Sequence, residues 1–239
     1  MAAPELGQAH HRRLREMWRS AGWPCHDALE LDLLAAGAMQ RCWDGEGRET
    51  LRVTDAGMAL LAAARRRNQA AFDAHEALVE RVAREMQRAG RLVWRGLSLR
   101  APLSAEDGST TWAMAMPDVY SIRHTTVEDY VEPIVHEIKV SRADLLSDLR
   151  RQAKAAAYLA LASQCWYVLR EGIAQADEVP ATYGVMLAGA SGLEVARAAP
   201  KRAMRLPLAV WMALARASAE PSAGEDGQEM LGDSTPTPA

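Results

Sequence analysis

The segment Ile134-Val135-His136-Glu137-Ile138-Lys139-Val140 decides the fold, because a β-branched, apolar run carries an acid and a base at a spacing of two. Side chains alternate between the faces of a strand, so Glu137 and Lys139 share one face. His136 lies on the other face, where we expect a packed or hydrogen-bonded core histidine. Burying an acid and a base is costly without partners. The segment predicts a strand that carries a polar site, the alternative being an ion-paired strand face at the surface.

Asp118 makes the polar site the stronger interpretation. If the strands around residues 118 and 137 form an antiparallel hairpin, a turn centred between Val127 and Glu128 places Asp118 opposite Glu137. Opposed residues have Cβ atoms about 5 Å apart, and two carboxylates at that distance repel unless a proton or a cation lies between them. Oxygen ligands suit Mg²⁺, which binds few carboxylates and keeps its waters. Lys139 would then contact a scissile phosphate or orient the attacking water, as in metal-assisted hydrolysis.

The flanking sequence predicts a mixed α/β domain. Apolar residues along one stripe predict a helix over residues 70–89. A capping signature at Ser141 opens a predicted helix over residues 141–163. A last helix is expected over residues 207–217, with Pro207 in its first turn. Strands are expected over residues 91–99, 112–122, 133–140, 164–170, 182–187 and 193–198.

The active-site spacing resembles that of a known superfamily. Pro117-Asp118, followed by Glu137-Ile138-Lys139 with Glu137 nineteen positions after Asp118, is similar to the pattern of the PD-(D/E)xK nucleases. Residues 70–198 match the element order of their restriction-endonuclease-like core, a central mixed sheet flanked by helices. The stretches that resemble the MmcB-like DNA repair proteins most closely are Pro117-Asp118-Val119, residues 136–141, Asp148-Leu149-Arg150 with Lys154 and Tyr158, Val179-Pro180, residues 183–187 and residues 193–197.

The resemblance implies roles for individual residues. Asp118 and Glu137 are expected to bind Mg²⁺ or Mn²⁺, helped by the Ile138 carbonyl, with Lys139 as the catalytic lysine. Many members of the superfamily add a glutamate from the helix before the first strand. The candidates here are Glu76 and Glu80, and Glu76 is preferred because it lies nearer the apolar stripe of its helix. An ordinary exposed helix acid is the alternative for either.

Basic residues follow the predicted catalytic strand. Arg150, Lys154 and Tyr158 are spaced four apart, which on one helix places them on a single face. We expect this face, together with Arg142, to contact DNA phosphates, although Tyr158 would pack equally well into the sheet.

Residues 1–67 predict a separate small domain. Helices over residues 10–20 and 25–36, strands over residues 38–43 and 50–53, and a helix capped by Thr54 or Asp55 resemble a winged helix. Residues 1–75 carry ten basic and ten acidic side chains, and the second helix has no basic residue. A protein contact or dimer interface is therefore expected slightly ahead of base reading.

Composition excludes several other classes. No apolar run reaches membrane-spanning length, and three cysteines without a CxxC pair indicate neither a disulfide framework nor a zinc site, which fits a reducing cytoplasm. The net charge is −3, but residues 219–239 hold five acids and no Lys or Arg, so the remaining body carries about +2. This acidic tail is expected to be disordered, after a nuclease-like domain over residues 68–218.

Two functions remain at this point. The first is a metal-dependent DNA nuclease acting in DNA repair or on mobile elements. The alternative is a non-catalytic DNA-binding or regulatory protein that uses the same fold as a platform.

Overall fold

A computed structural model describes residues 4–104 and 108–221 of the chain. It shows a mixed α/β protein that divides into two compact units, Met1–Phe72 and Asp73–Ala239, hereafter the N-terminal and C-terminal units. Most of the predicted acidic tail, residues 222–239, lies outside the described residues. Among the residues that are described, no helix is both long and apolar enough to cross a bilayer.

The N-terminal unit has the predicted order of two helices, a hairpin and a third helix. Its elements are α1 (Gln8–Arg19), α2 (Ala28–Ala35), β1 (Met39–Trp43), β2 (Glu49–Val53) and the start of α3 (Asp55–Arg88). Helix α2 begins later than expected, because His26 has a positive φ of 54° and Asp27 caps the helix by accepting from the N–H of Glu30. A small core holds the unit together: Leu14, Met17, Leu33, Ala38, Met39 and Leu51.

Helix α3 is longer than predicted. The two helices expected on either side of residue 67 are one continuous helix of 34 residues, Asp55–Arg88. No proline interrupts this sequence, and its one glycine, Gly57, lies in the first turn, so nothing in the chain ends the helix earlier. Thr54 caps it by accepting from the N–H of Gly57 at 3.1 Å.

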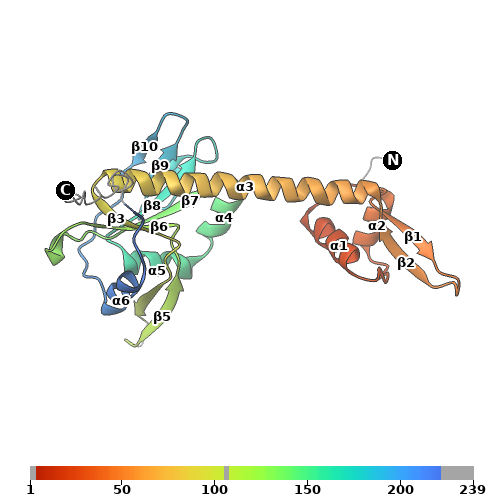
Figure 1. The fold of residues 1–239 in the computed structure, drawn as a ribbon, viewed down its shortest axis with the longest axis horizontal. Coiled ribbons are helices and arrows are strands. Elements are labelled where there is room, and N and C mark those ends of the chain that lie inside the picture. The colour runs from red at the N-terminus through yellow and green to blue at the C-terminus, as the bar shows by residue number, and fades with distance from the viewer. Residues whose placement is uncertain (1–3, 105–107, 222–239) are drawn as a thin grey trace, which may run out of the picture. The chain divides into compact units, whose positions relative to one another are not determined.

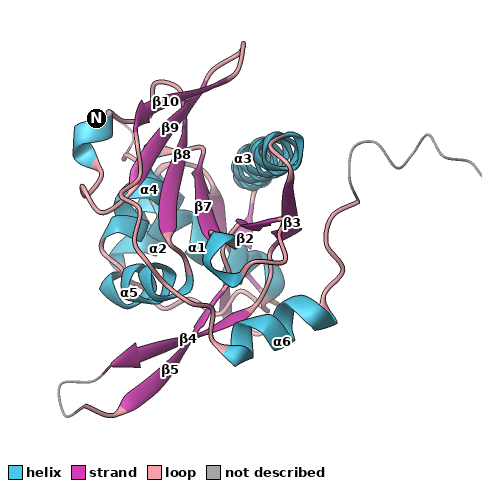
Figure 2. Cartoon of the chain, turned by 90° about the vertical axis from the view of Figure 1, so that its left-hand side faces the viewer, coloured by secondary structure: helices cyan, strands magenta, loops and turns pink. Residues whose placement is uncertain are grey.

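A six-stranded mixed sheet forms the centre of the C-terminal unit (Figures 1 and 2). Its strand order is β10-β9-β8-β7-β6-β3, and the pairs β7–β8 and β8–β9 are parallel while the others are antiparallel. The strands are β3 (Arg91–Arg95), β6 (Val119–Arg123), β7 (Ile134–Lys139), β8 (Gln164–Arg170), β9 (Gly184–Ala188) and β10 (Leu193–Arg197).

The single strand expected over residues 112–122 is wrong. Residues on either side of Pro117 belong to two sheets, since β5 (Thr110–Ala115) pairs with β4 (Leu99–Ser104) in a separate hairpin and β6 joins the central sheet. Proline has no N–H for a ladder hydrogen bond, so it favours a strand boundary at this position. The break places Asp118 at the start of β6.

Helices cover both faces of the sheet (Figure 1). Residues Leu78, Val79 and Val82 of α3 pack with Ile134 and Ile138 of β7 on one face. On the other face, Val135 packs with residues of α4 (Arg142–Leu149), α5 (Gln152–Leu161) and α6 (Leu208–Arg216). Strand β7 is therefore buried on both faces. Its side chains alternate between the core on the α3 side of the sheet and the core on the side of α4, α5 and α6.

Candidate active site

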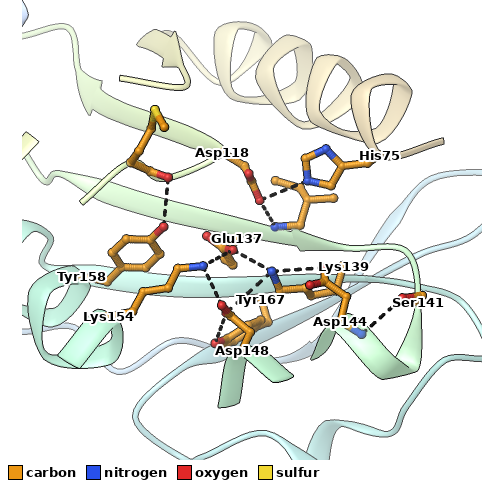
Figure 3. A network of polar contacts seen from close by, with 12 residues as sticks. His75, Asp118, Glu137, Lys139, Ser141, Asp144, Asp148, Lys154, Tyr158 and Tyr167 are labelled. Carbon is orange, nitrogen blue, oxygen red and sulfur yellow. Dashed lines mark hydrogen bonds and ion pairs between the residues drawn. The ribbon is translucent and has the colours of Figure 1, made fainter. Parts of the chain in front are cut away.

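The predicted pairing of Asp118 with Glu137 follows from the observed hairpin. Val119 pairs with His136 and Tyr120 with Val135 in the antiparallel pair β6–β7, so the next position along the chain brings Asp118 to Glu137. The loop between the strands contains a short 3₁₀ helix, Glu128–Tyr130, around the predicted turn centre. Asp118 Oδ2 accepts the backbone N–H of Ile138 at 2.7 Å, which fixes the carboxylate beside β7 (Figure 3).

Glu137 is a buried carboxylate with one satisfied and one unsatisfied oxygen. The residue is 4% exposed, and Oε1 accepts from Lys139 Nζ at 2.7 Å and from Lys154 Nζ at 2.5 Å. Oε2 is buried and has no hydrogen-bond partner among the described residues. Burial first, and then the charge of Asp118, raise the pKa of Glu137, while the two lysines oppose that rise. Glu137 thus has a buried oxygen without a hydrogen-bond partner among the described residues, and its carboxylate is close enough to Asp118 to be affected by that charge.

The carbonyl of Ile138 is placed to complete this group of oxygens. Its N–H points toward Asp118, and the N–H and C=O of a strand residue point to the same side. The hairpin register would set Pro117 opposite Ile138, and proline has no N–H to give to that carbonyl. The Pro117-Asp118 pair therefore places one carboxylate beside β7 and leaves the Ile138 carbonyl without its usual ladder partner.

Asp148 and Tyr167 extend the polar cluster on this face of the sheet. Asp148 accepts from Lys154 Nζ at 2.7 Å and from the hydroxyl of Tyr167 at 2.9 Å (Figure 3). Burial would raise the pKa of Asp148, but these contacts and Lys139 together lower it. Lys139 lies 3.6 Å from Asp148, so both lysines are shared between two buried carboxylates. The sequence pattern predicts no place in the polar site for either residue. Asp148 has the pattern of an exposed acid on a helix, and Tyr167 has that of a core residue in a strand.

His75 of helix α3 also contacts this site. Its Nε2 lies 3.4 Å from Asp118 Oδ2, and its Nδ1 lies 3.1 Å from Glu76 Oε1. The hydrogen bond to Asp118 raises the pKa of His75 to about 9, against the effect of burial. At neutral pH the imidazolium therefore holds Asp118 from the α3 side, and both Asp118 contacts among the described residues use Oδ2.

Glu76 lies at this site and Glu80 does not. A hollow of 400 Å³ is lined by His75, Glu76, Val79, Arg95, Gly96, Asp118 and Glu220. Glu80, one turn further along α3, instead lies 3.8 Å from Arg84. Glu220 was expected in the disordered tail, but its N–H donates to the Val93 carbonyl at 2.8 Å and its carboxylate lies 2.9 Å from Arg95 Nε.

The residues predicted to contact DNA do not form one surface. The helix expected over residues 141–163 is two helices, α4 and α5, which meet between Leu149 and Gln152. On one continuous helix Asp148 and Lys154 would be about 120° apart around the axis and therefore on different faces. The break instead brings their side chains into contact, so it builds the buried network.

The four side chains have different surroundings. Arg142 pairs with Glu178 at 2.7 Å, and Arg150 is exposed at the end of α4. Lys154 lies within the polar network, and its Nζ is 5.1 Å from the centre of the Tyr158 ring. Tyr158 is buried and donates its hydroxyl hydrogen to the Met116 carbonyl at 3.1 Å. Lys154 and Tyr158 thus support the carboxylate site rather than an outer surface.

His136 lies in the core on the α3 side of β7, as the alternation predicts, and neither ring nitrogen has a hydrogen-bond partner among the described residues. Burial first, and then the charge of Arg91, lower the pKa of His136 to about 3. In the unfolded chain the His136 imidazole binds a proton as the pH falls below about 6.5, whereas in the folded chain it stays neutral. The free energy of unfolding is therefore highest above pH 6.5 and decreases as the pH falls.

We expect the free energy of unfolding to fall by about 2 kcal/mol between pH 6.5 and pH 5 because of His136. Urea unfolding at both pH values measures this, and His136→Leu is expected to remove most of the difference. His124→Leu, at an exposed histidine, is the control and should leave the pH dependence unchanged. An equal pH dependence in wild type and His136→Leu would contradict the assignment.

Comparisons with known proteins place the chain in no family. No family model and no curated protein matches it. A solved structure of a protein of unknown function from Silicibacter pomeroyi is similar to 57% of this chain and 77% of its own, with 24% sequence identity and a TM-score of 0.39. A likeness this weak indicates neither a fold nor an activity.

Proposed function

We propose that the chain hydrolyses DNA phosphodiester bonds with the help of Mg²⁺ or Mn²⁺, using the Asp118–Glu137 pair as its metal site. The observation that carries the proposal is the unsatisfied Oε2 of Glu137, a buried oxygen of a carboxylate whose pKa is raised by the charge of Asp118. A buried polar atom without a hydrogen-bond partner is costly, and two carboxylates that influence each other repel. A divalent cation between them removes both costs.

The donor atoms present fit such an ion. The described residues contain no cluster of three or more His, Cys, Asp and Glu side chains that would enclose a metal. Mg²⁺ does not require one, because it is commonly bound by one or two carboxylates and substrate phosphate while it keeps several waters. Asp118, Glu137 and the Ile138 carbonyl would hold it. When bound, the ion would polarise the phosphate and lower the pKa of a coordinated water.

The protein's own groups would orient the reactants. Lys139 is 4% exposed and is held between Glu137 and Asp148, so its ammonium has one position from which to contact the phosphate or the attacking water. His75 and the N–H of Ile138 both hold Asp118 Oδ2. In the hydrolysis, the water oxygen bonds to phosphorus and one phosphorus–oxygen bond to the sugar breaks. The products are a phosphomonoester and a hydroxyl group.

The architecture supports the same proposal at a coarser level. A mixed sheet with helices on both faces, Asp118 directly before β6 and Glu137 on the neighbouring strand β7, is compatible with a restriction-endonuclease-like core. We extend the proposal to a winged-helix-like N-terminal unit and to a role in DNA repair or mobile-element processing. A cleavage assay tests it: single-stranded, duplex and branched DNA are incubated with Mg²⁺ or Mn²⁺, with EDTA as the blank. DNA binding without cleavage of any form would favour the non-catalytic platform.

Glu76 and Glu80 offer a matched pair of substitutions within that assay. Their side chains are 50% and 55% exposed and lie one turn apart on α3, but only Glu76 lines the hollow beside Asp118. We expect Glu76→Gln to lower the cleavage rate about 10-fold, the effect of losing a residue that orients a metal ligand, and Glu80→Gln to leave it unchanged. Equal rates for the two variants would remove Glu76 from the site.

A further inference from the structure

The arginines of helix α1 divide between two faces of the helix. Arg13 pairs with Glu30 and Asp27, each at 2.7 Å, on the side that packs against α2. Arg12, Arg15 and Arg19 are exposed on another face, where their spacing of three and four residues aligns them along the helix. Glu16, the one acid of α1, lies 3.5 Å from Arg13, and no ion pair among the described residues joins it to these three arginines.

This face of α1 forms a groove with the first half of α3. One hollow of 760 Å³ and a second of 650 Å³ share the lining residues Arg15, Ala64 and Asn68, so they are continuous. Helix α3 contributes Arg65 and Arg67 together with an apolar floor that includes Met58 and Leu61. Each hollow falls within the range of ligand-binding pockets, about 300–1,000 Å³.

The groove is cationic throughout. Five arginines line it: Arg12, Arg15, Arg19, Arg65 and Arg67. None of the described residues that line it is acidic, and none of these guanidinium groups has an ion-pair partner in the described part of the chain. By contrast, Arg41 and Arg48 on the hairpin of the same unit pair with carboxylates. Concentrated, unpaired charge of one sign raises the local potential and favours a polyanion.

Trp18 adds an aromatic surface to this charge. It lines the groove between Arg15 and Arg19, and 56% of it is exposed. The exposed indole offers a flat aromatic face, and arginines surround it. A cationic groove that follows a phosphate backbone, with aromatic rings on which bases stack, is how proteins bind single strands.

We propose that the α1–α3 groove binds single-stranded DNA, its arginines contacting phosphates and Trp18 stacking on an unpaired base. The inference goes beyond hydrolysis and does not rest on it, because every residue involved lies in the N-terminal unit. Duplex reading by α2 is disfavoured by the charge of that helix, which carries Glu30 and Asp32 and no basic residue. The preferred DNA would therefore contain an unpaired segment.

Fluorescence anisotropy with the full chain and a labelled oligothymidine of about 16 nucleotides tests the proposal. EDTA is present throughout, so the result does not depend on cleavage. Each phosphate contact contributes about −0.7 to the slope of log K against log salt. Arg15→Gln/Arg65→Gln is expected to weaken binding at least 10-fold and to reduce the slope by about 1.4. Arg41→Gln/Arg48→Gln removes the same charge outside the groove and should change neither.

Trp18 is tested with two substitutions and two oligonucleotides. Trp18→Ala is expected to weaken binding to oligothymidine about 10-fold, Trp18→Phe much less, and neither to weaken binding to an abasic strand of equal length. The exposed position of Trp18 predicts unchanged thermal unfolding in both variants. The proposal is overturned if wild type does not bind at low salt, if the Arg41/Arg48 control loses as much affinity, or if Trp18→Ala weakens binding to oligothymidine and to the abasic strand equally.

Discussion

Asp118→Asn is expected to abolish metal-dependent cleavage while the protein stays folded. The asparagine oxygen still accepts the Ile138 N–H, which Asp118 Oδ2 accepts at 2.7 Å, so the local structure is kept. The substitution removes one of two carboxylates from the proposed metal site. Losing about 4 kcal/mol of charge stabilisation at the reacting phosphate corresponds to a rate about 10³-fold lower. Initial rates of cleavage with saturating Mn²⁺ measure the effect.

The stability of the same variant distinguishes a metal site from a structural pair. Asp118 raises the pKa of Glu137, which means that the two carboxylates repel in the absence of an ion. The substitution removes that repulsion and also the attraction between Asp118 and the His75 imidazolium, so the two effects oppose each other. We expect the free energy of unfolding without metal to stay within about 1 kcal/mol of wild type. Asp129→Asn, the same substitution at an exposed position of the β6–β7 loop, is the control for both measurements. Full cleavage by Asp118→Asn would end the site assignment.

Glu137→Gln should behave differently, because it destabilises the fold as well. Glu137 is the main counter-ion of Lys139, whose side chain is 6% exposed. Removing one partner of a buried pair typically costs 3–5 kcal/mol, and we expect about 3 kcal/mol here because Asp148 remains 3.6 Å from Lys139. Urea unfolding at pH 7 measures the loss. Glu178→Gln, which breaks the exposed pair with Arg142, is the matched control and should cost under about 1 kcal/mol.

A double substitution identifies the cause of this loss. In Glu137→Gln/Lys139→Met the charge that was left without its partner is also removed. The double variant should therefore recover at least half of the stability lost in Glu137→Gln. If the stability lost in the double variant equals the sum of the losses in the two single variants, the Glu137–Lys139 pair is not the source of the destabilisation.

The features that could be predicted from the sequence are those that depend on short-range pattern. Alternation along residues 134–140 assigned His136 to one face and Glu137 to the other, and the observed pairing of β6 with β7 is the predicted one. Both follow from the geometry of strands and of hairpins, in which a residue's neighbours are set by counting along the chain. Two predictions were wrong because an element ends inside a stretch that was predicted to be continuous. The predicted strand ends before Pro117, and the predicted helix divides into α4 and α5.

The contacts between distant segments required the folded chain. His75 contacts Asp118 because helix α3 packs on the central sheet. Tyr167 contacts Asp148 because β8 is the neighbour of β7 within that sheet. The distribution of charge likewise depends on the folded structure. Residues 1–75 are balanced in their total charge, yet folding places Arg15 and Arg65 together in a groove and pairs Arg13 with acids elsewhere. A sum over a sequence contains no directions, and electrostatic recognition depends on which side chains share a surface.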